Sequence, residues 1–431
     1  MIPTKIIKPR EREAIIRALR SGVVPNTGLQ YIQVGRNQEV QSFLRDIDTV
    51  ADGGASLRLV IGEYGSGKTF FLSLVRSLAL ERGLVAMKAD LSPEKRFHGT
   101  KGQAQRLLAE LIASLSTRTK RDGNALVPIL ERLEARCADE GIKPQQLLLP
   151  LRDLPGGHDF GRVVQIYLEA EYPSRKADAL RWLQAEYYTK TDAQRDLGVR
   201  TYMGDADLFA SLRLYATLAR CAGYKGLYVC LDELVNLYKI TNAVSRRANY
   251  EELLSILNNT LQGNFEGLGI VLSGTPEFLT DTRRGLYSYE ALRSRLAENS
   301  LAQQSGLKDY DSTVLRLANL TQEELYVLLK NLRAVGASSD ASLMERLPDE
   351  ALEAYLRYCF DKIGESYFRT PRNTIKGFLD LMSLLQQYPD RTWRDLLPTI
   401  SISIDVDPTP PHRHHPPASH RFRARQLPPI E

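Results

Sequence analysis

Short apolar runs alternate with amphipathic stretches through the first 315 residues of the chain. The runs at residues 57–61, 84–89, 227–231 and 268–272 are short and almost wholly apolar, which is typical of parallel strands buried on both faces. Residues 69–80 follow the first run with helical spacing. Strands that alternate with helical segments predict a doubly wound α/β fold with a parallel sheet.

A long helical pattern interrupts this alternation between about residues 92 and 205. Leucine and isoleucine recur at helical spacing over residues 107–112 and 126–133, and Pro150 and Pro155 break the pattern in its middle. We therefore expect a large, mostly helical insertion in the α/β domain.

The pattern becomes helical again after residue 317. Thr321 and Glu324 have the spacing of a capping box, and Thr370-Pro371 is a second helix start, with proline in the first turn. These signals predict a C-terminal helical lid. The expected organisation is an N-terminal segment (1–50), a core (51–315), the lid (316–405) and a basic, Pro/His-rich tail (406–431) that we expect to be disordered.

Composition is that of an ordinary globular protein, with 43% hydrophobic and 25% charged residues in 431. No apolar run approaches the roughly 18 residues that span a bilayer, and the charges within residues 1–20 leave no apolar region for a signal peptide. We expect a cytoplasmic protein without a membrane partner. The four cysteines lack short metal-type spacing.

The net charge of +5 is concentrated at the two ends of the sequence. Residues 1–20 carry six basic and two acidic side chains, and residues 408–431 carry four arginines and one glutamate. Basic ends on a near-neutral body suit a sequence-independent contact with DNA phosphates. Solvated termini explain the same pattern equally well.

A complete phosphate-binding motif follows the first predicted strand. It consists of Gly62, Glu63, Tyr64, Gly65, Ser66, Gly67, Lys68 and Thr69, with Phe70 next in the helix. The pattern is that of a P-loop, G-x-x-x-x-G-K-[ST], in the required setting between a strand and a helix. Main-chain N–H groups of such a loop point at phosphates, Lys68 would reach the β- and γ-phosphates, and Thr69 would ligate Mg²⁺. The sequence therefore predicts a site for ATP and Mg²⁺.

Polar residues end the next two predicted strands of the core. Asp232 and Glu233 follow residues 227–231, at the strand ends where parallel sheets bind ligands. Asp232 would hold Mg²⁺ as a Walker B aspartate, and Glu233 would activate the attacking water as a general base. Ser273 and Thr275 end the following strand, and either could sense the γ-phosphate.

Two arginines lie where they could reach nucleotide phosphate from outside the core. Arg295 could act on the γ-phosphate of a neighbouring subunit, and Arg372, at the start of a lid helix, could reach back to the nucleotide. Position alone leaves both open, because surface arginines are usually solvated.

Together these motifs resemble an AAA+ ATPase of the origin-recognition and STAND type. Residues 34–36 with Glu39 resemble the segment beside the adenine, so the resemblance implies roles for Gly35 and Arg36 in nucleotide binding. Arg295 resembles an arginine finger, and Arg372 resembles the sensor-2 arginine of the lid. The resemblance also implies an oligomer in the presence of ATP.

A closer resemblance covers about residues 25–400. Residues 231–234, 249–251, 261–263, 274–278 and 284–292 carry it. This set resembles the ATP-binding proteins of BREX phage-defence systems, in particular the smaller BrxD type. It implies a role in bacterial antiviral defence beside a helicase-like partner, on or near DNA.

Three functions are compatible with these residues. An ATP-driven motor or loader would use Arg295 across subunits, whereas an ATP-gated switch or scaffold would turn over slowly and control partner binding. A small-molecule kinase shares the P-loop but leaves Glu233 and the lid arginine unexplained. Turnover with and without DNA separates the first two.

Overall fold

The sheet at the centre of the molecule is parallel throughout. The computed structural model describes residues 7–204 and 208–403. Its strands are β1 (Ala55–Ile61), β2 (Val85–Asp90), β3 (Leu227–Asp232), β4 (Leu268–Gly274) and β5 (Val314–Arg316), in the order β2-β3-β4-β1-β5. The pairing of β1 runs from Ala55 opposite Leu268 to Ile61 opposite Gly274. The ends of β1, β3 and β4 therefore meet at one edge.

Alternating residues of each strand divide the interior into two cores. On β3, Leu227, Val229 and Leu231 belong to one apolar cluster, whereas Tyr228 and Cys230 belong to the other. Because both faces of the sheet are covered, its strands read as continuous apolar runs.

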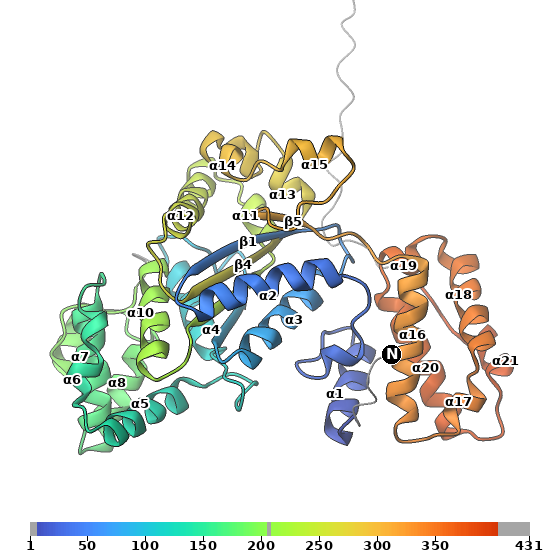
Figure 1. The fold of residues 1–431 in the computed structure, drawn as a ribbon, viewed down its shortest axis with the longest axis horizontal. Coiled ribbons are helices and arrows are strands. Elements are labelled where there is room, and N and C mark those ends of the chain that lie inside the picture. The colour runs from blue at the N-terminus through green and yellow to red at the C-terminus, as the bar shows by residue number, and fades with distance from the viewer. Residues whose placement is uncertain (1–6, 205–207, 404–431) are drawn as a thin grey trace, which may run out of the picture.

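Helices cover both faces of the sheet. On one face lie α2 (Asn37–Ala51) and α3 (Lys68–Glu81), where Phe43 and Phe71 meet edge to face with ring centroids 5.2 Å apart. On the other lie α4 (Gln103–Ala113), α10 (Leu208–Cys221) and α12 (Ala243–Leu261). Figure 1 shows α2 and α3 in front of β1 and β4.

The insertion between β2 and β3 is helical, as predicted. It comprises α4, α5 (Leu126–Glu140), α6 (Pro144–Leu147), η2 (Leu149–Leu151), α7 (Gly157–Glu169), α8 (Pro173–Leu183), α9 (Lys190–Leu197) and α10. Phe160 packs against Trp182 and Tyr215 at its centre. This core is continuous with one face of the sheet, so the insertion is an extension of the α/β core.

The lid forms its own apolar cluster beside the core. It comprises α16 (Gln322–Ala337), α17 (Leu343–Arg346), α18 (Asp349–Ile363), α19 (Ser366–Arg369), α20 (Arg372–Gln387), α21 (Trp393–Leu396) and η4 (Leu397–Thr399). Thr321 and Glu324 form the predicted capping box. Pro371 is the N-cap of α20, one position before the expected one. The α/β fold with a helical insertion and a C-terminal helical lid is thus confirmed.

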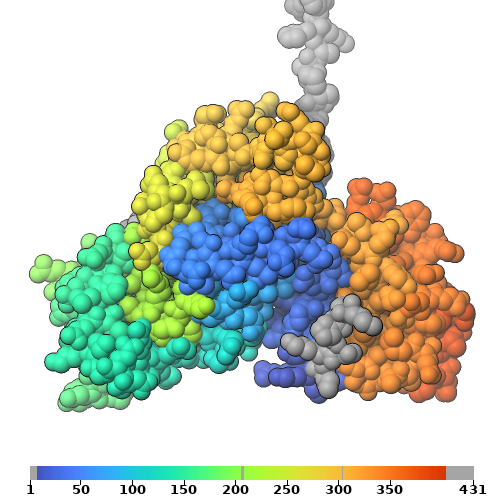
Figure 2. All heavy atoms as spheres, in the orientation of Figure 1, coloured from blue at the N-terminus to red at the C-terminus, as the bar shows by residue number. Residues whose placement is uncertain are grey.

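The first helix of the described chain packs on the lid. Helix α1 (Pro9–Arg20) contacts α20, Ile15 joins the lid cluster, and Arg20 pairs with Asp380 at 3.0 Å. The short η1 (Leu29–Tyr31) follows. In Figure 2 the N-terminal residues, in dark blue, lie between the core and the orange lid. The sequence did not predict this pairing of the two ends.

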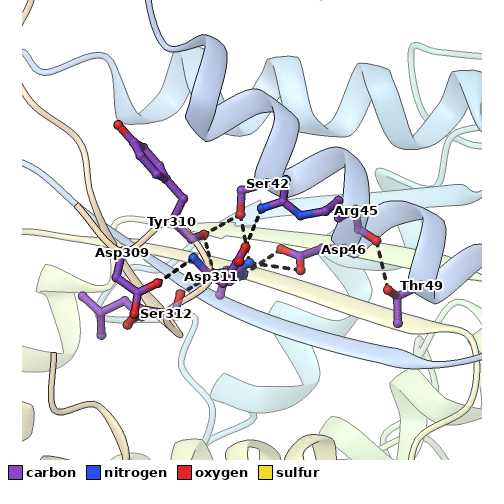
Figure 3. Close-up of polar contacts among 10 residues, drawn as sticks. Ser42, Arg45, Asp46, Thr49, Asp309, Tyr310, Asp311 and Ser312 are labelled. Carbon is purple, nitrogen blue, oxygen red and sulfur yellow. Dashed lines mark hydrogen bonds and ion pairs between the residues drawn. The ribbon is translucent and has the colours of Figure 1, made fainter. Parts of the chain in front are cut away.

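A buried arginine, Arg58, ties α2 and β1 to the segment before β5. Figure 3 labels its partners on α2 and in that segment. The Arg58 side chain is only 7% exposed and donates to Asp46 at 2.7 Å and to the carbonyl of Tyr310 at 3.1 Å. It also donates to the carbonyl of Ser312 and to the Ser42 hydroxyl. Burial raises the pKa of Asp46, while Arg58 opposes the rise. The network fixes the approach to β5.

Several short helices follow the strand ends. They are α11 (Val235–Tyr238), α13 (Pro276–Thr280), η3 (Leu286–Ser288), α14 (Glu290–Arg295) and α15 (Ser300–Gln304). They lie with α12 at the top of Figure 1. No helix in the described ranges is long and apolar enough to span a membrane. The predicted tail at 406–431 lies outside the described residues.

Candidate nucleotide-binding site

The phosphate-binding motif forms a tight loop between β1 and α3. Gly65 and Gly67 have φ values of +82° and +83°, which β-branched or bulky residues rarely adopt. A β-carbon on Gly65 would lie 2.7 Å from the carbonyl oxygen of Arg369 in the lid. The loop therefore needs glycine both for its backbone conformation and for the close approach of the lid.

Lys68 closes the loop from the first turn of α3. Its Nζ donates to the carbonyl oxygens of Gly62 and Glu63, each at 2.9 Å. The ammonium group therefore lies across the loop, where it can bind a phosphate group.

The predicted magnesium ligands lie next to each other. The Thr69 hydroxyl donates to Oδ2 of Asp232 at 2.6 Å. Oδ1 of the same carboxylate accepts the Ser273 hydroxyl and the N–H of Glu233, the latter at 2.9 Å. A hydroxyl and a carboxylate oxygen at the mouth of a P-loop suit Mg²⁺, which also takes water and phosphate oxygens.

Asp90 is a further acid at this strand end that sequence reasoning missed. It lies opposite Asp232 in the pairing of β2 with β3. Burial, and then the Asp232 carboxylate, raise its pKa. The sequence does contain a signal for Asp90. It directly follows the apolar run 84–89, just as Asp232 directly follows the apolar run 227–231.

The two candidate sensor residues have different surroundings. Ser273 is fully buried and contacts Asp232. Thr275 is the N-cap of α13, with its hydroxyl accepting the N–H of Phe278 at 3.4 Å. Of these two residues, Ser273 alone hydrogen-bonds to Asp232 in the described structure.

A cavity of about 240 Å³ lies between the P-loop, the lid and the N-terminal segment. Tyr64, the 65–70 stretch and Glu233 line one side. Arg36, Arg372 and apolar side chains line the rest. The apolar lining residues outside the 65–70 stretch are Leu19, Val23, Val24, Ile32, Val34, Phe71, Leu74, Leu320, Leu328, Pro371 and Ile375. A polar mouth and an apolar wall suit a nucleotide, whose base is flat and whose phosphates are charged.

Gly35 and Arg36 join three parts of the molecule. Gly35 has φ +60°, and a β-carbon there would lie 2.0 Å from Oε1 of Glu324 in the lid. Nη2 of Arg36 donates to the carbonyls of Ser66, at 2.9 Å, and Ala318, at 2.6 Å. Arg36 thus links the P-loop to the connection between β5 and the lid. Burial lowers its pKa.

Arg372, the candidate lid sensor, lines the cavity. Its Cδ is 3.3 Å from the position that a β-carbon on Gly22 would take. No carboxylate within 7–204 or 208–403 pairs with its guanidinium.

Arg295 lies away from the cavity of its own chain. Its Nε donates to Oδ1 of Asn258 at 2.5 Å, and its Nη1 donates to the carbonyl of Ala291. It is exposed at the end of α14. The structure therefore does not bring Arg295 together with Lys68 and Glu233 in one chain.

Glu233 has an unusual backbone and a perturbed carboxyl group. Its φ is +60°, a region that residues other than glycine rarely adopt. Partial burial, and then the Asp232 carboxylate, raise its pKa, whereas Lys68 opposes the rise. A carboxyl group with a raised pKa is a stronger base for water than an ordinary one.

Comparisons with known proteins place the chain in a family. No curated protein matches the sequence significantly. Among solved structures, the chain is similar to one in the structure of Drosophila ORC bound to DNA, at 14% identity and a TM-score of 0.38, over 91% of this chain and 73% of that one. The sequence model of the BREX system ATP-binding protein BrxC/D family matches residues 7–400. This match confirms the resemblance indicated by the sequence motifs, and the chain belongs to the BrxC/D family of BREX system ATP-binding proteins.

Proposed function

We propose that the chain is a Mg²⁺-dependent ATPase of the AAA+ type that acts in the cytoplasm as a component of a BREX anti-phage system. The observation that carries the proposal is the 2.6 Å hydrogen bond between Thr69 and Asp232. It joins the P-loop to the Walker B strand, with Glu233 as the next residue.

Each residue then has one task. Main-chain N–H groups of the P-loop and the Lys68 ammonium hold the β- and γ-phosphates. Thr69 and Asp232 would hold Mg²⁺, which neutralises charge on the phosphate oxygens. Glu233 takes the proton of the attacking water, and Ser273 holds the Asp232 carboxylate in place.

The residues at the rim complete the site. Arg36 and Arg372 bind from the N-terminal segment and from the lid. Thr275 remains the weaker sensor candidate because it caps α13. Arg295 is exposed and does not line the cavity of its own chain, so we assign it to the γ-phosphate of a neighbouring subunit in an ATP-dependent homo-oligomer.

Membership of the BREX family supports the proposal that the chain acts on or near DNA, beside a helicase-like partner. The basic residues 8–20 offer cations for a sequence-independent contact, although Arg20 is already paired with Asp380. Such binding should weaken steeply between about 50 and 200 mM salt.

Lys68→Ala is expected to weaken Mg·ATP binding by about 10- to 150-fold, because a charge-assisted contact with phosphate contributes about 1.5–3 kcal/mol. Nucleotide affinity and steady-state hydrolysis should be measured for the wild type and the variant, with and without duplex DNA. If the wild type binds ATP tightly but does not hydrolyse it, with or without DNA, an ATP-gated switch or scaffold would explain the site better than an ATPase.

The pH dependence of turnover should report the raised pKa of Glu233. Because the carboxylate is the active form, kcat/KM should fall with decreasing pH, with its midpoint above the ordinary value of 4.5. Asp232 and Asp90 raise the pKa of this group, while Lys68 and Lys239 lower it. The measurement is kcat/KM, from initial rates at Mg·ATP concentrations well below saturation, from about pH 5 to 8. The residual activity of Glu233→Gln should lack this acid limb.

A further inference from the structure

The segment after Glu233 is tied to the segment that leads to Arg295. We propose that Tyr238, Asp281 and Arg284 form a positioning network, which holds Glu233 in its catalytic orientation and couples it to α14. The inference rests on the proposed role of Glu233 as general base.

Glu233 needs such support because its backbone is strained. A φ of +60° at a residue other than glycine persists only when the surroundings hold it. On one side, the N–H of Leu234 donates to the carbonyl of Ser273 at 3.0 Å. Asn236 adds a bond from its side-chain amide to the carbonyl of Leu91 at 2.8 Å. These contacts fix the beginning of α11.

Arg284 fixes the end of α11. Its Nη2 donates to the carbonyls of Tyr238, at 3.1 Å, and Ile240, at 3.4 Å. Its guanidinium lies over the Tyr238 ring, 5.3 Å from the centroid. One side chain thus binds the last turn of the helix through both its main chain and an aromatic ring.

Asp281 connects the end of α11 to the segment that leads to α14. Its Oδ2 accepts the Tyr238 hydroxyl at 2.7 Å, and its Oδ1 accepts the N–H groups of Arg283 and Arg284. The Tyr250 hydroxyl donates to the carbonyl of Arg284 at 2.7 Å, which anchors the turn on α12. A shift of α14 against a neighbouring subunit would therefore move the end of α11 and, through that short helix, Glu233.

The network lies outside the nucleotide cavity. None of Tyr238, Asp281 and Arg284 is among the described residues that line it. A positioning role therefore predicts a change in turnover without a change in nucleotide affinity, which general destabilisation would not produce.

The test is Tyr238→Phe in the full chain, which removes only the hydroxyl bonded to Asp281. We expect kcat to fall about tenfold, since a small misplacement of a catalytic group is costly, with Kd for Mg·ATP within about twofold. Amide hydrogen exchange without nucleotide should become faster at residues 234–240. The control is Tyr358→Phe, which removes a hydroxyl bond to the carbonyl of Ile400 in the lid and should change neither quantity.

The possible outcomes separate clearly. Unchanged kcat and unchanged exchange at 234–240 would overturn the inference, as would a parallel loss of affinity with faster exchange throughout the chain. If the wild type hydrolyses no ATP, the proposed function fails and the catalytic role of the network fails with it. Faster exchange confined to 234–240 would then still support the tie between α11 and Asp281.

Discussion

Replacing Glu233 with glutamine is expected to lower kcat for ATP hydrolysis by about 10²- to 10⁴-fold, the usual contribution of a general base. Glutamine keeps the size and shape of the side chain but cannot take a proton from water. The P-loop, Lys68 and Thr69 are unchanged, so Kd for Mg·ATP should stay within about threefold. Single-turnover hydrolysis and equilibrium nucleotide binding measure the two quantities separately.

Glu266→Gln is the matched control for this substitution. Glu266 pairs with Arg220 at the opposite end of β4 and is 75% exposed, so its loss should leave turnover unchanged. If Glu233→Gln and the wild type turn over at the same rate, Glu233 is not the base. A slow, nucleotide-gated scaffold would then account for the site better than a motor.

Arg58→Ala is expected to lower the free energy of unfolding by about 3 kcal/mol, because it leaves a mostly buried carboxylate without its buried partner. The Arg58 and Asp46 side chains are 7% and 17% exposed. The variant also leaves the carbonyls of Tyr310 and Ser312 without this donor. Urea unfolding followed by circular dichroism gives the difference.

Arg45→Ala tests whether burial of the ion pair is the reason for the large loss of stability expected for Arg58→Ala. Arg45 pairs with Asp311 in the same network (Figure 3), but the two side chains are 60% and 75% exposed. An exposed pair contributes at most about 1 kcal/mol. Equal losses for Arg45→Ala and Arg58→Ala would mean that the buried pair does not anchor the approach to β5.

Local pattern was sufficient to predict the centre of the fold and of the site. The four predicted strands are largely apolar because both faces of the sheet are buried, and the P-loop needs contiguous residue types. Asp232 could be found because parallel strands bring their ends to one edge. These predictions needed only residues that are adjacent in the sequence, together with the rule that the carboxyl ends of parallel strands meet at one edge of the sheet.

Features that depend on distant partners were not predictable. The pattern of α1 is amphipathic, but nothing in it indicates that Ile15 packs in the lid. The apolar wall at Val23 and Val24 lies in a segment without regular spacing, and β5 has only three residues. The different surroundings of Ser273 and Thr275 were not predictable either, because both are small hydroxyl residues at the end of one strand.

The pairing of α1 with α20 sets the order in which a nascent chain can complete its binding site. The bond between Arg20 and Asp380 joins residues 360 positions apart, and such distant contacts form late because closing a long loop costs entropy. During synthesis, α20 emerges from the ribosome only after most of the lid has been made. Until then α1 has no partner to pack on, and the adjoining residues 22–34 cannot complete the apolar wall of the cavity. The P-loop can fold early with the core, but the enclosed cavity should be among the last parts of the molecule to mature.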